Sequence, residues 1–262
     1  MDKEKNINAQ NDYLDKYISS ETKQMTWEIF RMSFPNILTL ILISLFDTFL
    51  YRFVGKISPL SLASFAIGYS IVRLTSVSYI LGVNSAIYTL ISQYYGMKNY
   101  YKCAIFLYLG IIFCNLFATI SFIISLFSYD ILKLFGVEDL IAQGASIFAK
   151  HSIIYVFFIL NFDILKRMLN AQKIVNPQFY ITIINGLLQI IYSYFFIKYF
   201  DFLGAIYSLS LANILNFAWT LIYLYYTGIC NNIVMKVKLN DIYQSIIEYL
   251  EIAIPGGLNL GI

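Results

Sequence analysis

Two oppositely charged residues, Asp47 and Arg73, stand within long apolar stretches of the sequence. An ionised side chain at the centre of a bilayer costs roughly 2.5–3.5 kcal/mol on insertion scales, so such residues usually pair, face a cavity or carry function. Asp47 could bind a cation or a proton, or it could be a structural partner for another helix. Arg73 is its expected partner, and we predict an Asp47–Arg73 interaction across the first two helices.

Uncharged polar side chains recur in a later apolar segment, at Asn185, Gln189 and Ser193. Amide and hydroxyl groups there can hydrogen-bond a substrate or water in a cleft. They can equally form interhelical contacts, which contribute about 0.6 kcal/mol each in membrane proteins. We predict that these three residues, with Asp47 and Arg73, line a substrate or ion pathway, and structural contacts are the alternative.

We expect structural roles for the other charged residues near the ends of apolar segments. Asp163 and Arg167 have i, i+4 spacing and are expected to form an ion pair on a helix surface. Lys166 and Arg167 can extend toward lipid headgroups. His151 is the only histidine and has no second His or Cys nearby, so we predict no metal site and an interfacial position.

The sequence contains no pattern that predicts catalysis or a bound cofactor. A Gly-rich phosphate loop, a Walker sequence and a Ser/His/Asp grouping are all missing from the sequence. The cysteines stand alone in apolar stretches and are expected to be small buried hydrophobic residues: Cys103, Cys114 and Cys230. We therefore expect a protein that is not an enzyme, and any energy for transport to come from an ion gradient instead of ATP.

The composition indicates a helical membrane protein that crosses the bilayer several times. Of the 262 residues, 59% are hydrophobic and 13% are charged, and the mean hydropathy is +0.69. A typical globular domain has about 25% charged residues, roughly twice this share. The net charge of +3 is small and the basic residues are scattered, which argues against nucleic acid as a partner.

Six apolar segments are long enough to cross a bilayer, since a spanning helix needs about 20 residues. They cover residues 33–54, 60–92, 103–127, 145–165, 179–199 and 204–227. The second is longer than one crossing needs and should tilt or extend beyond the lipid. The polar tail before them is expected to be disordered or loosely helical. Twelve Lys and Arg residues fall on the side of the N-terminus and five on the other, which predicts a cytosolic N-terminus.

A short internal repeat suggests a second lobe. Four residues recur 220 positions later in the sequence: Glu28 as Glu248, Pro35 as Pro255, Leu38 as Leu258 and Leu40 as Leu260. A restart after six segments means that both copies enter the membrane from the same side, as in transporters with parallel repeats. We therefore expect a tail (1–27), a six-helix lobe (28–228), a linker (229–245) and the start of a second lobe (246–262). Pro35 and Pro255 are expected near helix N-termini, and Pro177 at the entry to the fifth helix.

Three stretches resemble signatures of the multidrug and toxin extrusion (MATE) family, most closely its eukaryotic branch. The first signature is carried by Gly82, Ser85, Ala86, Thr89, Leu90, Gln93 and Gly96. The second is carried by Arg167, Leu169, Gln172 and Pro177, with Asn170 where the family has Gln. The third is the stretch 187–213, and the restart at Pro255 follows in the expected order.

This resemblance implies a twelve-helix exporter of two six-helix lobes, of which the chain supplies the first. Such proteins exchange H⁺ or Na⁺ for organic cations and other xenobiotics. Bacterial members of the family have an acidic residue in the first helix, at the position that corresponds to Leu50, and Asp47 lies nearly one turn before it. Their Asn and Asp in the fifth helix correspond to Gln189 and Ser193. The coupling Glu of eukaryotic members would follow Ile262.

Two alternatives to an efflux antiporter are open. One is a lipid-linked flippase of the same superfamily, which would need a cationic cleft. The other is a half-transporter that does not transport, or that associates with another lobe.

Overall fold

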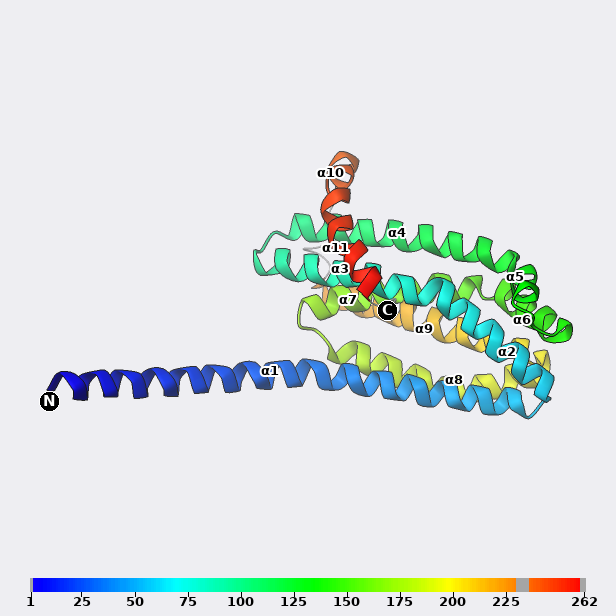
Figure 1. Cartoon of the computed structure of the whole chain (residues 1–262), viewed down its shortest axis with the longest axis horizontal. Helices are drawn as coiled ribbons and strands as arrows, with labels where there is room; N and C mark the ends of the chain where they lie inside the picture. The colour runs from blue at the N-terminus through cyan, green and yellow to red at the C-terminus, as the bar shows by residue number, and fades with distance from the viewer. Residues whose placement is uncertain (1, 230–235, 260–262) are drawn as a thin grey trace.

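The structure is a computed structural model that describes the backbone of residues 2–229 and 236–259. Side chains are described in these ranges except for 2–21, 77–83 and 256–259. Nearly all of this backbone is α-helical, and the long helices lie side by side along a common direction (Figure 1). The described part of the chain is therefore an all-α bundle, as the sequence predicts.

The first helix, α1 (Asp2–Gly55), is longer than predicted, and its N-terminal part projects beyond the other helices (Figure 1). The tail that we expected to be disordered or loosely helical continues the first span, because the residues before Pro35 include many good helix formers. Pro35 therefore lies inside the helix and not near its start, which corrects our expectation. Membrane helices tolerate an internal proline because neighbouring groups replace the lost hydrogen bond.

The second apolar segment is broken and is not one α-helix. It comprises α2 (Pro59–Val72), a six-residue π-helix η1 (Arg73–Ser78) and α3 (Tyr79–Gly96). π-Helical turns are rare and often occur at functional sites. Here the π-helix begins at Arg73, one of the two intramembrane charges that the sequence singles out.

The fourth segment is also broken, although we predicted a single span over residues 145–165. The helices α6 (Asp139–His151) and α7 (Ile153–Ala171) meet at an angle of 51°. The hydroxyl of Ser152 at the bend donates a hydrogen bond of 2.6 Å to the carbonyl of Ala149. The short helix α5 (Ser128–Leu134) connects α6 to the preceding span.

Three further helices match the third, fifth and sixth predicted segments: α4 (Tyr100–Leu126), α8 (Asn176–Phe200) and α9 (Leu203–Thr227). Pro177 lies in the first turn of α8, as expected. These helices and the part of α1 from Thr22 are long and apolar enough to cross a membrane, and the bent α6–α7 pair makes a fifth candidate. A crossing by α2 and α3 stays a prediction, because the side chains between them are not all described.

Close packing between α1 and α8 depends on one glycine. A Cβ atom on Gly186 would lie 1.9 Å from the Phe46 ring, so only glycine lets this ring lie directly against the α8 backbone. From there α8 packs on α9, and α9 packs on α7. On the other side of the bundle α2 packs on α6, and α3 packs on α4 and α7.

The last two helices, α10 (Leu239–Gln244) and α11 (Ile246–Asn259), lie against α3 and α4 (Figure 1). Tyr249 is fully buried there, and its ring stacks on Phe113 with centroids 5.2 Å apart. Pro255 lies inside α11, so it is not at a helix start as we expected. The proposed linker thus contains a short helix, and the domain boundaries stay predictions.

An ion pair holds α11 to the bundle beside this aromatic contact. The Lys102 ammonium lies 2.8 Å from Glu248, and the Tyr94 hydroxyl donates a hydrogen bond to the same carboxylate. The ammonium also lies 5.0 Å from the centre of the Tyr94 ring. The Lys102 and Glu248 side chains are 33% and 35% exposed, so water screens part of this interaction.

We predict that the Glu248→Gln substitution loosens α11 without unfolding the bundle. Since the pair is charge-assisted but partly exposed, it should contribute about 1 kcal/mol, which corresponds to about fivefold faster amide hydrogen exchange in α11. The matched control is Glu251→Gln, because Glu251 is exposed on the same helix. Equal exchange rates in the two variants would show that the ion pair does not hold α11.

Candidate functional site

The predicted Asp47–Arg73 pair is present between α1 and the junction of α2 with η1. Arg73 Nη1 lies 3.6 Å from Asp47 Oδ2. The Tyr69 hydroxyl donates a hydrogen bond of 3.3 Å to the same oxygen, and the Arg73 guanidinium lies 5.5 Å from the centre of the Tyr69 ring. The Asp47 side chain is 16% exposed and that of Arg73 is 52% exposed, so the acid is the more enclosed partner.

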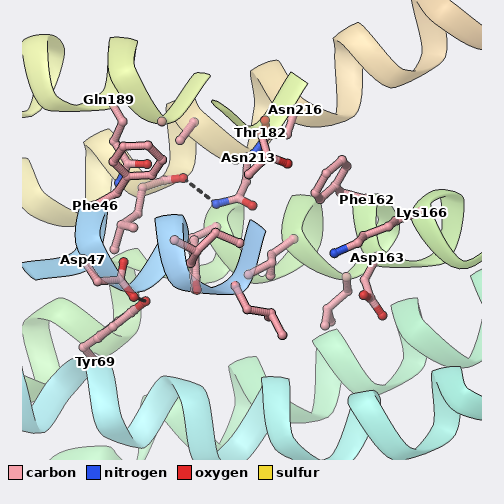
Figure 2. Close-up of a pocket in the computed structure, with 18 residues that line it drawn as sticks. Phe46, Asp47, Tyr69, Phe162, Asp163, Lys166, Thr182, Gln189, Asn213 and Asn216 are labelled. Carbon is pink, nitrogen blue, oxygen red and sulfur yellow. Dashed lines mark hydrogen bonds between the residues drawn. The ribbon is translucent and has the colours of Figure 1, made fainter. Parts of the chain in front are cut away.

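Asp47 lies at the edge of a cavity of about 200 Å³ between α1, α2, α7, α8 and α9. Its wall is mostly apolar, and each of the five helices contributes at least one polar side chain to it. Figure 2 shows the lining, which comprises Leu40, Ile43, Phe46, Asp47, Tyr69, Tyr155, Ile159, Leu160, Phe162, Asp163, Lys166, Thr182, Gly186, Gln189, Leu209, Ala212, Asn213 and Asn216. The bundle thus contains a small, mostly apolar cavity with a few polar side chains in its wall.

The polar residues predicted in the fifth segment lie at or near this cavity. Gln189 lines it directly. Asn185 donates a hydrogen bond of 2.6 Å to the lining residue Asn216. Ser193 is buried on the same helix but does not line the cavity, and Arg73 does not line it either. Only Asp47 and Gln189 of the five predicted pathway residues are therefore in the cavity wall, and the functional role of all five stays a prediction.

A second ion pair lies at the α7 side of the cavity. Arg167 Nε lies 2.7 Å from Asp163 Oδ2, which confirms the predicted pair. The pair is not on an open helix surface, however, because the Asp163 and Arg167 side chains are 24% and 21% exposed and Asp163 lines the cavity. Asn84 of α3 also donates to Asp163 Oδ2, at 2.8 Å. This face of α7 therefore lies against α3 and the cavity.

Sequence reasoning missed Lys166, Asn213 and Asn216 as cavity residues. We expected Lys166 to extend to headgroups, whereas it lines the cavity together with Asp163. An available signal was that Lys166 follows Asp163 by three residues, which places both on one helix face. The two asparagines have the same three-residue spacing on α9. Spacing alone could not tell which face turns inward.

The described signature residues mark helix ends or form hydrogen bonds within a helix. Gln172 follows the last residue of α7, and its side-chain amide donates to the Met168 carbonyl at 3.2 Å. Gly96 ends α3, and Gln93 is exposed near that end. On the same helix the Thr89 hydroxyl donates to the Ser85 carbonyl at 3.2 Å. Gly82 belongs to α3 in a stretch whose side chains are not described.

The remaining candidates for metal or thiol chemistry are structural where they are described. His151 is exposed at the end of α6, and its Nδ1 atom lies 2.8 Å from the Ile147 carbonyl oxygen. Cys103 and Cys114 are buried thiols, and Cys230 lies outside the described residues. Among the side chains that are described, no group of three or more His, Cys, Asp or Glu residues could hold a metal ion.

Comparison with known proteins matches this architecture to transporters. The model of the MatE family matches residues 35–195. Protein DETOXIFICATION 14 of Arabidopsis thaliana is 27% identical over 206 residues, which are 77% of this chain and 42% of that protein. Protein DETOXIFICATION 39 of the same plant is 29% identical over 187 residues, which are 70% of this chain and 36% of that protein.

Solved structures show the same fold. The crystal structure of the eukaryotic MATE transporter AtDTX14 superposes with a TM-score of 0.82 at 24% identity, covering 88% of this chain and 52% of that one. An outward-facing multidrug resistance MATE family transporter of the MOP superfamily gives a TM-score of 0.75 at 17% identity, with 89% and 52% covered. The chain therefore has the fold of one lobe and spans about half the length of these transporters.

We predict that exchanging the two charges restores stability that either single change removes. Asp47→Arg or Arg73→Asp alone places like charges together, and the expected loss is about 1–3 kcal/mol, below the range for fully buried pairs because Arg73 is half exposed. The double variant should recover most of this loss. Thermal unfolding in detergent, followed by the fluorescence of Trp27 and Trp219, measures it. A double variant no more stable than the single ones would show that the pairing contributes nothing.

Proposed function

The chain belongs to the MatE family of transporters, and we propose from this that it forms the first lobe of an efflux transporter. The transporter exchanges H⁺ or Na⁺ for organic cations or other small xenobiotics by alternating access. It lies in a membrane with its N-terminus on the cytosolic side. The chain spans about half the length of the solved relatives.

The observation that carries this proposal is the enclosed acid Asp47 at the edge of the cavity. A carboxylate that is 16% exposed can accept a proton or a cation from the cavity without a large rearrangement. Tyr69 and Arg73 stabilise its charged form while the site is empty of other cations. A proton or Na⁺ that binds Asp47 competes with Arg73, because both neutralise the same charge.

This competition offers a route for coupling. When an ion replaces Arg73 as the partner of Asp47, the contact between α1 and the start of η1 weakens. Helix α1 forms part of the cavity wall, and η1 adjoins it. The state with an ion on Asp47 and the state with Arg73 paired to Asp47 therefore favour different positions of these helices around the cavity. A ligand with unequal affinity for these positions is then coupled to the ion, as alternating access requires.

The exposed apolar surface supports a membrane location and a further partner surface. Large apolar side chains on α1 and α8 are about half exposed, among them Ile37, Ile41, Leu187 and Ile191. In a bilayer such residues contact lipid or another helical lobe. We propose that a second lobe covers part of this surface, and that it comes from additional sequence or from a second copy of the chain.

Transport in liposomes tests the proposal. The reconstituted chain should accumulate at least one of two probes when a proton or Na⁺ gradient is imposed: tetraethylammonium, a simple cation, or 4-(aminomethyl)benzoate, a zwitterion. Dissipating the gradient should stop accumulation. Asp47→Asn should reduce the initial rate by about tenfold or more, because it removes the ionisable group that couples the two fluxes.

The matched control is Asp130→Asn, since Asp130 is exposed on α5 and distant in sequence from the cavity residues. It should transport like the original chain. Crosslinking in the same liposomes shows whether the active form contains one copy or two. A folded chain that accumulates neither probe would contradict the proposal and favour the half-transporter alternative. Gradient-independent movement of a fluorescent lipid would favour the flippase alternative.

A further inference from the structure

Lys166 places a positive charge in the cavity wall without a matching counter-charge. It lines the cavity from α7, and Figure 2 shows its ammonium extending toward the cavity while the Asp163 carboxylate points in a different direction. Within the part of the chain whose side chains are described, the Lys166 ammonium has no ion pair and no hydrogen bond. An enclosed charge without a partner is costly, so this position favours an anion.

The two acids of the cavity wall are already neutralised by other residues. Asp47 is paired with Arg73 at 3.6 Å and accepts a hydrogen bond from Tyr69. Asp163 is paired with Arg167 at 2.7 Å and also accepts a hydrogen bond from Asn84. Asp163 attracts the neighbouring Lys166 across one helical turn, but its own charge is matched by Arg167. The charge balance of the site is therefore positive by one, and Lys166 carries the excess.

The rest of the wall limits what kind of anion fits. The cavity of about 200 Å³ is smaller than pockets for drug-sized ligands, which have volumes of about 300–1,000 Å³. Most of the wall is apolar, with Ile159, Leu160 and Phe162 on the same helix as Lys166. Gln189 and Asn216 add amide groups that can bind carboxylate or carbonyl oxygens.

We propose that this cavity binds the carboxylate of a small organic acid or zwitterion, and that Lys166 is the residue that binds the carboxylate. The carboxylate forms a charge-assisted hydrogen bond with the Lys166 ammonium, and the apolar part of the ligand fills the space between α1, α7 and α9. The inference that such a compound is transported rests on the proposed function. The inference that the cavity binds it does not depend on that function.

Binding of three compounds of one shape tests the proposal. Benzoate is anionic, benzylammonium is cationic and benzyl alcohol is neutral. Isothermal titration of the purified chain in phosphatidylcholine nanodiscs should give the tightest binding for benzoate. Lys166→Gln should weaken benzoate binding by about tenfold or more, since a hydrogen bond between charged groups is lost, and should leave benzyl alcohol within about twofold.

Two variants serve as controls. Lys166→Arg keeps the charge and should bind benzoate within about threefold of the original chain. Lys150→Gln removes an exposed lysine of α6 and should have no effect. The fluorescence of Trp27 and Trp219 during heating shows whether each variant is folded. If Lys166→Gln does not fold, Lys166→Met provides the same comparison with a neutral side chain of similar length.

Five results would overturn the proposal. The first four are no binding of benzoate, equal binding of benzoate by the original chain and Lys166→Gln, tighter binding of benzylammonium than of benzoate, and full displacement of benzoate by chloride at equal concentration. Displacement by phosphatidylglycerol added to the nanodisc would also overturn it, since the anion would then be a lipid headgroup. If benzoate binding depends on Lys166 but the chain transports neither probe, only the proposed function is contradicted. If the chain transports a probe but benzoate binding does not depend on Lys166, only this inference is contradicted.

Discussion

Enclosed charges in a lipid environment must be paired or must face a cavity, and the described bundle satisfies this constraint at two places. Asp47 and Arg73 form one pair, and Asp163 and Arg167 form the other. The first pair joins α1 to η1, the second lies on α7, and an acid from each lines the same cavity. The breaks at η1 and between α6 and α7 lie in the helices that carry these charges. At η1 the irregular backbone begins at the charged residue itself, Arg73.

Charge pairing and apolar length were predictable from the sequence because both depend on residue type and spacing. The first, third, fifth and sixth apolar segments each correspond to one long helix, and the Asp47–Arg73 pair and the i, i+4 pair of α7 are present. The π-helix and the 51° bend were not predictable, because tertiary packing of apolar residues decides where a long apolar run breaks. The predicted position of Lys166 was wrong for the same reason. Its position near a span end suggested the headgroups, but it lines the cavity.

Two contacts on opposite sides of the bundle connect its outer helices to the rest. Glycine at position 186 lets Phe46 close the contact between α1 and α8, and the pair of Lys102 with Glu248 holds α11 on the other side. The apolar faces of α1 and α8 are covered by neither contact. These faces form an exposed apolar surface that lipid or a second lobe can cover.

The central claim is that ion binding at Asp47 is coupled to the ligand in the cavity. Infrared difference spectroscopy of the chain in nanodiscs tests it directly, because a protonated carboxyl group has a stretching band that a carboxylate lacks. We expect a pH-dependent band that Asp47→Asn removes, and we expect the pH of half-maximal intensity to shift when a bound ligand is added. A band that Asp47→Asn leaves unchanged, or one whose pH dependence is the same with and without ligand, would contradict the account.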